Sequence, residues 1–137
     1  MTVVLDASVV VAAAIDEEDV GPWARSVLSG ELVAPAHWLV EAVGAVEAVG
    51  AVRRAWLTER VSEEVASLAT ADLARLPVRV VPLVGLMPRV WELRRTVSAA
   101  DACYVAVAEG LGAPLATLDH RLTRASGPRC EFVTPSA

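Results

Sequence analysis

The chain has 137 residues, which is enough for one compact domain with a sizeable core but too few for two. All twelve basic residues are arginine, and the absence of lysine excludes Schiff-base chemistry, a phosphate-binding P-loop and phosphotransfer sites that pair an aspartate with a lysine. The net charge of −5 and the pI near 5.0 disfavour a sequence-independent nucleic-acid binder of the basic-patch kind.

Short apolar runs alternate with amphipathic segments along the chain. The pattern predicts, in chain order, a strand at 3–5, helices at 8–15 and 22–28, a strand at 32–34, helices at 38–57 and 60–76, a strand at 78–81, helices at 86–97 and 98–110, a strand at 114–118, a helix at 121–125 and a strand at 131–133. Because the strands are apolar on both faces and alternate with helices, we expect a single domain over residues 1–137 with a three-layer α/β/α fold and a mostly parallel sheet.

The chain shows no sign of a membrane or secretory segment. No stretch reaches the ~18 uncharged apolar residues that a membrane span needs. The N-terminus lacks the basic flank and the small-residue cleavage site of a signal peptide. We therefore expect a soluble, cytoplasmic protein with no membrane contact.

Cys103 and Cys130 lie far from any C-x-x-C spacing and are interpreted as reduced core residues.

Four carboxylates are candidates for a shared site. Two predicted strands lead directly into Asp6 and Asp119, and the carboxyl ends of parallel strands meet at one edge of a sheet. Asp101 stands in the first turn of the helix that follows Ser98, and Glu41 is early in the third predicted helix. Each aspartate also has a structural interpretation: Asp6 and Asp119 as Asx turns or N-caps, and Asp101 with Ser98 as a capping box.

Carboxylates gathered at one edge repel one another, by about 3 kcal/mol for each pair at ~5 Å and an effective dielectric constant of ~20. Such a cluster must take up protons or bind a cation. Oxygen-only ligands favour Mg²⁺ or Mn²⁺ over Zn²⁺. Hydrated Mg²⁺ held by carboxylates is typical of phosphodiester chemistry, so the cluster points to a metal-dependent enzyme acting on phosphodiesters.

The ordered set of motifs resembles a PIN-domain ribonuclease, and most closely the VapC-type toxins of bacterial toxin–antitoxin pairs. The resemblance rests on VVLDAS at residues 3–8, Pro35 with Glu41, SAADACYVAVAE at residues 98–109 and APLATLDHRL at residues 113–122. It covers nearly the whole chain, and the motifs keep the family's order and spacing. It implies an endoribonuclease that uses Mg²⁺, with Mn²⁺ as a possible substitute, and leaves a 5′-phosphate and a free 3′-hydroxyl.

The resemblance also implies roles for individual residues. Asp6 and Asp101 are the principal metal ligands, Asp119 is a further direct or water-mediated ligand, and Glu41 is a ligand or orients the attacking water. All four are catalytic residues in this interpretation.

The family's small hydroxyl positions fall on Ser8 and Thr117, which would hold a carboxylate or a water in orientation. Gly44 is a departure, since many relatives carry a polar residue there; a packing role for this glycine is the alternative.

The implied partners are an RNA substrate, a cognate antitoxin protein and a second copy of the chain in a homodimer. We place the antitoxin contact on the helices between residues 22 and 76.

Four arginines are candidate phosphate contacts: Arg94, Arg95, Arg121 and Arg124. The four tryptophans are interpreted as core or interface residues rather than base-stacking ones: Trp23, Trp38, Trp56 and Trp91.

Two other functions remain open. A noncatalytic PIN-like module would keep the fold as a protein-binding scaffold, but the retained carboxylates disfavour it. A phosphotransfer domain would use Asp6 or Asp119 as phosphoacceptor, and the missing lysine speaks against it.

Overall fold

The computed structural model describes residues 1–16, 18–38 and 48–136. The strands are β1 (Thr2–Leu5), β2 (Glu31–Pro35), β3 (Val78–Val81), β4 (Leu115–Ala116) and β5 (Phe132–Val133). The helices are α1 (Ala7–Ile15), α2 (Gly21–Val27), α3 (Ala48–Leu57), α4 (Glu63–Arg75), the 3₁₀ helix η1 (Val84–Leu86), α5 (Met87–Glu92), α6 (Ala99–Leu111) and α7 (His120–Arg124).

The five strands form one sheet in the order β3-β2-β1-β4-β5, and every neighbouring pair is parallel. From β1 the chain moves outward through β2 to β3, and then returns to the other side of β1 for β4 and β5. The direction of winding therefore changes between β1 and β4, where Leu5 is in register with Ala116. Open parallel sheets bind ligands beyond the carboxyl ends of their strands at such a switch point.

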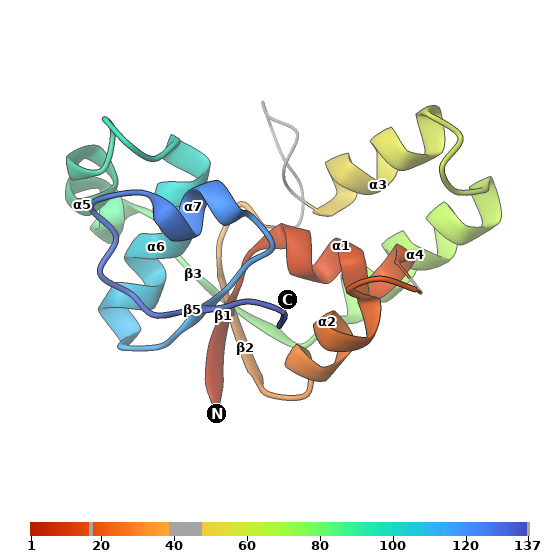
Figure 1. Ribbon diagram of the computed structural model, residues 1–137, viewed down its shortest axis with the longest axis horizontal. Coiled ribbons are helices and arrows are strands. Elements are labelled where there is room, and N and C mark those ends of the chain that lie inside the picture. The colour runs from red at the N-terminus through yellow and green to blue at the C-terminus, as the bar shows by residue number, and fades with distance from the viewer. Residues whose placement is uncertain (17, 39–47, 137) are drawn as a thin grey trace.

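Helices cover both faces of the sheet. Figure 1 shows α1 to α4 on one side and α5 to α7 on the other. The predicted three-layer fold with a parallel sheet is thus confirmed. Connections between parallel strands are right-handed. The helices that connect β1 to β2 and β3 therefore lie on one face of the sheet, and those that lead to β4 and β5, on the other side of β1, lie on the opposite face.

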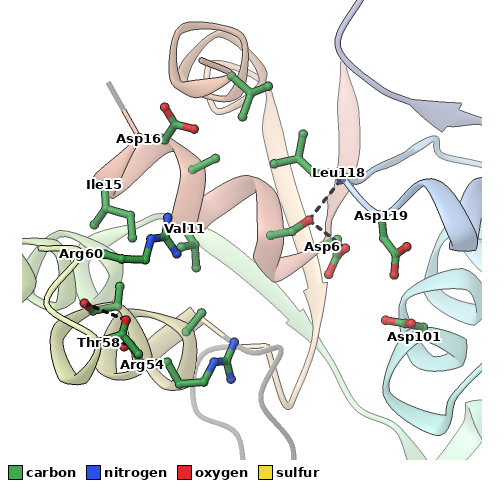
Figure 2. A pocket seen from close by; sticks show the side chains of 15 residues that line it. Asp6, Val11, Ile15, Asp16, Arg54, Thr58, Arg60, Asp101, Leu118 and Asp119 are labelled. Atoms are coloured by element: carbon green, nitrogen blue, oxygen red, sulfur yellow. Dashed lines mark hydrogen bonds between the residues drawn. The ribbon is translucent and has the colours of Figure 1, made fainter. Parts of the chain in front are cut away.

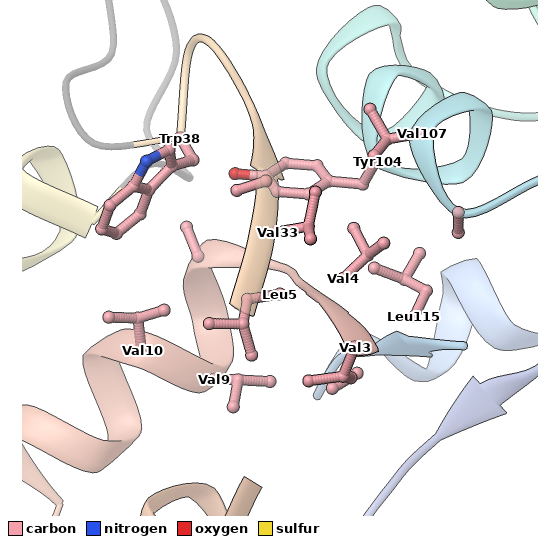
Figure 3. Packing of buried hydrophobic residues seen from close by; sticks show 14 of the residues in the cluster. Val3, Val4, Leu5, Val9, Val10, Val33, Trp38, Tyr104, Val107 and Leu115 are labelled. Carbon is pink, nitrogen blue, oxygen red and sulfur yellow. The ribbon is translucent and has the colours of Figure 1, made fainter. Parts of the chain in front are cut away.

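The core lies between β1, β2 and the helices on either side of them (Figure 3). Val3, Val4 and Leu5 are all buried, as expected of a central parallel strand covered on both faces. In the other helical layer, α6 is buried without interruption over residues 102–108. The Tyr104 ring, fully buried, reaches from α6 across β2 toward Trp38. The helix α6 packs directly against both β1 and β2.

Some predicted boundaries were wrong. The helix expected at 60–76 begins only at Glu63, because the hydroxyl of Ser62 accepts a hydrogen bond from the Val65 N–H and caps it there. The helix expected at 86–97 ends at Glu92 and is followed by turns. The strand expected at 114–118 is only two residues long. Of the helix expected at 38–57, residues 48–57 are helical as predicted.

The tryptophans and cysteines lie in different environments. Trp38 is buried and Trp23 packs against the core, but Trp56 and Trp91 are 45% and 67% exposed, so of the two expected places, core or interface, the core is ruled out for these two and the interface stays a prediction. Both cysteines are reduced, one buried and one half-buried. Within the described residues, no helix is both long and apolar enough to cross a membrane.

Candidate functional site

Asp6 follows β1 and is only 5% exposed. Its Oδ2 atom accepts hydrogen bonds from the hydroxyls of Thr117, at 2.6 Å, and Ser8, at 2.9 Å. Asp6 occupies the N-cap position of α1, but its side chain makes no capping hydrogen bond to that helix. Two hydroxyls instead fix the orientation of a buried carboxylate at the switch point of the sheet.

The same two hydroxyls connect the ends of β1 and β4. Thr117, fully buried, also accepts from the N–H of Asp119 at 3.0 Å. Ser8 accepts from the N–H of Leu118 at 3.2 Å. Each hydroxyl therefore donates to Asp6 and accepts from the backbone that leads to the second aspartate. This arrangement sets the position of Asp119 relative to Asp6.

Asp119 caps α7. Its Oδ1 atom accepts from the N–H groups of Arg121, at 2.9 Å, and Leu122, at 3.4 Å, so the predicted N-cap role is confirmed. The Arg121 Nε atom lies 4.0 Å from the same oxygen. Within the described residues Oδ2 has no such partner, which leaves one carboxylate oxygen of Asp119 for another role.

Asp101 lies in the first turn of α6. Its N–H donates to the Ser98 hydroxyl at 3.2 Å, which confirms Ser98 as the N-cap. Burial, together with repulsion from Asp6 and Asp119, raises the pKa of Asp101 from 3.8 to about 6, although Ser98 and Arg121 act in the opposite direction. Burial likewise raises the pKa of Asp6, against the lowering effect of its two hydroxyl donors.

The three aspartates line one cavity of about 540 Å³ (Figure 2). Val11 and Ile15 of α1 form part of its apolar wall. A smaller cavity of about 260 Å³ lies beside it, shares Asp101 and Asp119, and is bounded by Arg121. The sequence-predicted carboxylates of β1, α6 and the segment after β4 are thus brought to one place. Glu41 and Gly44 lie outside the described residues.

Sequence reasoning missed two arginines that line the larger cavity, Arg54 and Arg60. Of the four arginines predicted to contact phosphate, Arg121 lines the smaller cavity with Asp101 and Asp119, and the other three line neither of these two cavities. Arg94 instead lies over the Trp91 ring at 4.6 Å. The positions of Arg54 and Arg60 depend on where α3 ends and on how α3 packs against α1. The local sequence pattern does not predict this packing.

His37 was also missed. Burial lowers the pKa of its imidazole, while the charge of Asp6 acts in the opposite direction, so the ring lies within electrostatic reach of Asp6. Its ring meets the Tyr104 ring edge-on, with centroids 5.1 Å apart. His37 lies between Pro35 and Glu41 in the sequence, but it belongs to none of the motifs on which the resemblance rests.

The donor set suits a hard divalent cation. Three carboxylates line one recess, and two have raised pKa values because they are buried together. Among the residues that the structure describes, no three acidic, histidine or cysteine side chains are close enough to hold one ion directly. Mg²⁺ commonly keeps several waters and binds through one or two carboxylates, so this spacing is compatible with it.

Comparison with known proteins gives a consistent result. The family model of the PIN domain matches residues 3–128. Ribonuclease VapC12 of Mycobacterium tuberculosis is 39% identical over 131 residues, which cover 95% of this chain and 96% of that protein. Ribonuclease VapC9 of the same organism is 34% identical over 128 residues, with 93% and 94% covered.

Two solved structures support the fold alone. The Mycobacterium tuberculosis toxin VapC20, described as cleaving the sarcin–ricin loop, superposes with a TM-score of 0.57 at 20% identity over 88% of this chain and 92% of its own. VapBC2 of Rickettsia felis, bound to a promoter DNA fragment, gives 0.60 at 12% identity over 99% and 100%. The predicted resemblance is confirmed, and the chain belongs to the PIN-domain family, among the VapC ribonucleases.

Proposed function

We propose that this chain is an endoribonuclease that hydrolyses RNA phosphodiester bonds with the help of Mg²⁺, for which Mn²⁺ can substitute. The observation that carries the proposal is the convergence of Asp6, Asp101 and Asp119 on one recess at the switch point of the sheet. The names of the relatives, all ribonucleases, supply the substrate class. We further propose that residues 1–137 act as a single PIN domain.

In this proposal Asp6 and Asp101 hold the cation, and Asp119 contacts it directly or through a water. Glu41 completes the acidic set. A divalent cation, when bound, lowers the pKa of water and neutralises charge that develops on the phosphate. Because the pKa of Asp101 is raised to about 6, cation binding below neutral pH would displace a proton from this carboxyl group.

Other residues have positioning roles in the proposal. Ser8 and Thr117 keep the carboxylate of Asp6 in one orientation, because each donates a hydrogen bond to its Oδ2 atom. Asp119 uses Oδ1 to cap α7, which leaves Oδ2 to face the cation or its water shell. The short α7 is thereby held in a fixed position beside the reacting phosphate.

We also propose that the protein is the toxin of a toxin–antitoxin pair and forms a homodimer. The superposed structure from Rickettsia felis is VapBC2, a VapB–VapC pair by name, which supports an antitoxin partner. The α3–α4 region carries exposed apolar side chains at Trp56, Leu57 and Leu68, within the residues where we place the antitoxin contact. We take these exposed apolar side chains as candidates for the apolar part of that contact.

The test is cleavage of RNA by the purified chain in Mg²⁺, in Mn²⁺ and in EDTA. We expect cleavage in either metal, none in EDTA, and a loss of at least roughly a hundredfold in Asp6→Asn and Asp101→Asn. The control is Asp72→Asn, which neutralises an exposed aspartate on α4. Cleavage that survives EDTA or both substitutions contradicts the mechanism. A chain that binds a partner but cuts no RNA in any metal is the noncatalytic module.

The toxin role has its own test. Induced expression is expected to arrest bacterial growth, and coexpression of the adjacent gene product to relieve the arrest. Continued growth with verified soluble wild-type protein contradicts the toxin role but leaves the ribonuclease test above unaffected.

A further inference from the structure

The side chains of Arg54 and Arg60 make no interaction with the protein that would hold them in place, as far as the described residues show. Both are exposed, and both line the cavity that contains the three aspartates. Within the described residues, neither guanidinium forms an ion pair or a hydrogen bond. By contrast, Arg25 donates to carbonyl groups at the end of α1, and Arg89 pairs with Glu109. Two guanidinium groups with no such partner among the described residues lie beside recessed carboxylates and form with them a site of mixed charge.

The backbone of the α3–α4 turn places these two side chains. The helix α3 ends in a Schellman motif, in which the Arg60 N–H donates to the Ala55 carbonyl at 2.8 Å and the Glu59 N–H donates to the Trp56 carbonyl at 3.0 Å. Glu59 takes the left-handed conformation that such a motif requires, with φ of 60°. This reversal turns the chain back, and Arg60 points into the cavity near Val11 (Figure 2).

A third cation lies on the other side of the aspartates. Arg121, at the start of α7, bounds the smaller cavity that shares Asp101 and Asp119 with the larger one. The acidic centre is therefore flanked by Arg54 and Arg60 on one side and by Arg121 on the other. A polyanion that passes through both cavities would contact first the arginines of the larger cavity, then the proposed metal site, and then the arginine of the smaller cavity.

We propose that Arg54 and Arg60 bind backbone phosphates of a single-stranded RNA on one side of the bond that is cut, and that Arg121 binds a phosphate on the other side. The inference rests on the proposed ribonuclease function and adds the path of the substrate. Guanidinium groups bind phosphate through two parallel hydrogen bonds. Since Asp6 is only 5% exposed, the reacting phosphate must enter a recess, which favours a flexible single strand over a rigid duplex.

The arrangement of charges around the aspartates is compatible with RNA at this position. The aspartates would repel the phosphates next to the reacting one, and a single divalent cation neutralises only part of that charge. Arginines at both ends of the path would offset the repulsion of those phosphates that are too far from the cation to be neutralised by it. The apolar wall at Val11 and Ile15 lies beside the arginines and offers a surface for unstacked bases.

The experiment compares the double variant Arg54→Gln/Arg60→Gln with the control Arg53→Gln/Arg75→Gln. The control removes two exposed arginines from α3 and α4 that do not line the cavity. Cleavage of a single-stranded RNA of about 12 nucleotides is followed at several salt concentrations. We expect KM to rise about tenfold or more in the test variant, with a much smaller change in kcat, while the control keeps wild-type values.

Two further results separate phosphate binding from a structural effect. The slope of log(1/KM) against log salt is expected to fall by about 0.7 for each phosphate that the variant no longer neutralises. Arg54→Lys/Arg60→Lys, which keeps the charge but not the bidentate geometry, is expected to recover the slope and only part of the KM. Arg121→Gln is expected to lower the slope in the same way.

Equal KM values in test and control variants overturn the proposal. So does a test variant that cleaves RNA normally but no longer binds its antitoxin, because the arginines then serve a protein contact. If the wild-type chain cuts no RNA, the proposed function fails by itself. Direct binding of the same labelled RNA in Ca²⁺ then decides this proposal, which falls if both double variants bind equally well.

Discussion

At the scale of single residues, Thr117 links the two aspartates at the strand ends. Its hydroxyl donates to Asp6 Oδ2 at 2.6 Å and accepts from the Asp119 N–H at 3.0 Å, and the side chain is fully buried. Both hydrogen-bonding capacities are used, so the hydroxyl has one orientation. The relative position of the two carboxylates consequently depends on this oxygen atom together with the Ser8 hydroxyl.

Thr117→Val keeps the shape of the side chain but removes this oxygen. We expect kcat/KM for RNA to fall roughly 10- to 100-fold and the Mg²⁺ concentration for half-maximal activity to rise. The unfolding free energy should fall by about 1–3 kcal/mol, because the Asp119 N–H loses its acceptor. The control is Thr70→Val, whose hydroxyl bonds only within α4. Wild-type metal dependence in Thr117→Val would contradict a positioning role.

At the scale of elements, the α3–α4 turn contains a strained residue. Glu59 has φ of 60°, the only positive φ among the described non-glycine residues. This conformation costs an L-residue roughly 1–2 kcal/mol and is normally taken by glycine at the end of a helix. Glu59 lies between Thr58 and Arg60, which both line the cavity, so the turn that carries the strain also shapes the proposed RNA path.

Glu59→Gly tests this strain. We expect the unfolding free energy to rise by about 1 kcal/mol, because glycine adopts the left-handed conformation without steric cost. Glu64→Gly, in the first turn of α4, is expected to lower it by about 1 kcal/mol. Urea denaturation of both variants measures the difference. Destabilisation by both substitutions would show that Glu59 is not strained in solution.

The element α6 is held at its far end by a charged contact. Glu109 accepts from Arg89 Nε at 2.7 Å and from the Arg129 N–H at 2.7 Å, and Arg89 also donates to the Gly127 carbonyl at 2.8 Å. Burial alone would raise the pKa of Glu109, but these donors hold it below its ordinary value. The contact ties α5, α6 and the segment before β5 together.

Glu109→Gln removes the charge and keeps the shape. We expect a loss of about 1.5–3 kcal/mol in unfolding free energy, which thermal and urea unfolding would measure. Glu92→Gln removes the exposed partner of the same arginine and is expected to cost less than about 1 kcal/mol. Equal losses in the two variants would contradict the importance of burial in this contact.

At the scale of the whole molecule, the fold brings together carboxylates that are far apart in sequence. Asp6, Asp101 and Asp119 come from the end of β1, from α6 and from the segment after β4. Burial and mutual repulsion raise the pKa of Asp101 to about 6 and raise that of Asp6 as well. The folded protein therefore binds protons at this site more tightly than the unfolded chain does.

The consequence is a stability that depends on pH. In EDTA the unfolded chain releases the Asp101 proton near pH 4 and the folded protein near pH 6, so the contribution of Asp101 to stability falls between these values and stays low above them. We expect Asp101→Asn to match the wild-type Tm at about pH 4 and to exceed it at about pH 7. A wild-type Tm that exceeds the variant's at neutral pH would contradict the raised pKa.

Mg²⁺ should reverse this difference. A ligand that binds only the folded state stabilises it, so Mg²⁺ is expected to raise the wild-type Tm at neutral pH and to leave Asp101→Asn nearly unchanged. Asp72→Asn is the matched control and should respond like the wild type. An equal response of all three proteins would place the ion elsewhere.

Much of the fold followed from local patterns in the sequence. Apolar runs followed by aspartate predicted β1 and the segment after β4, and the Ser98 hydroxyl caps α6 as its spacing indicated. The alternation of strands and helices was sufficient for the three-layer architecture, because parallel strands require crossover helices. The candidate carboxylates Asp6, Asp101 and Asp119 were identified in the same way.

The rest depended on tertiary structure. Local rules could not separate the role of Asp119, whose side chain caps α7, from that of Asp6, whose side chain makes no capping hydrogen bond and accepts from Thr117 and Ser8. Nor could they place Arg54 beside the acidic recess, since helix packing decides which side chains share a cavity. The sequence alone determined the kinds of chemical group and their order along the chain, because these follow from periodicity and short-range hydrogen bonding. Which of these groups meet in space depends on the tertiary structure, because such contacts join segments far apart in the chain.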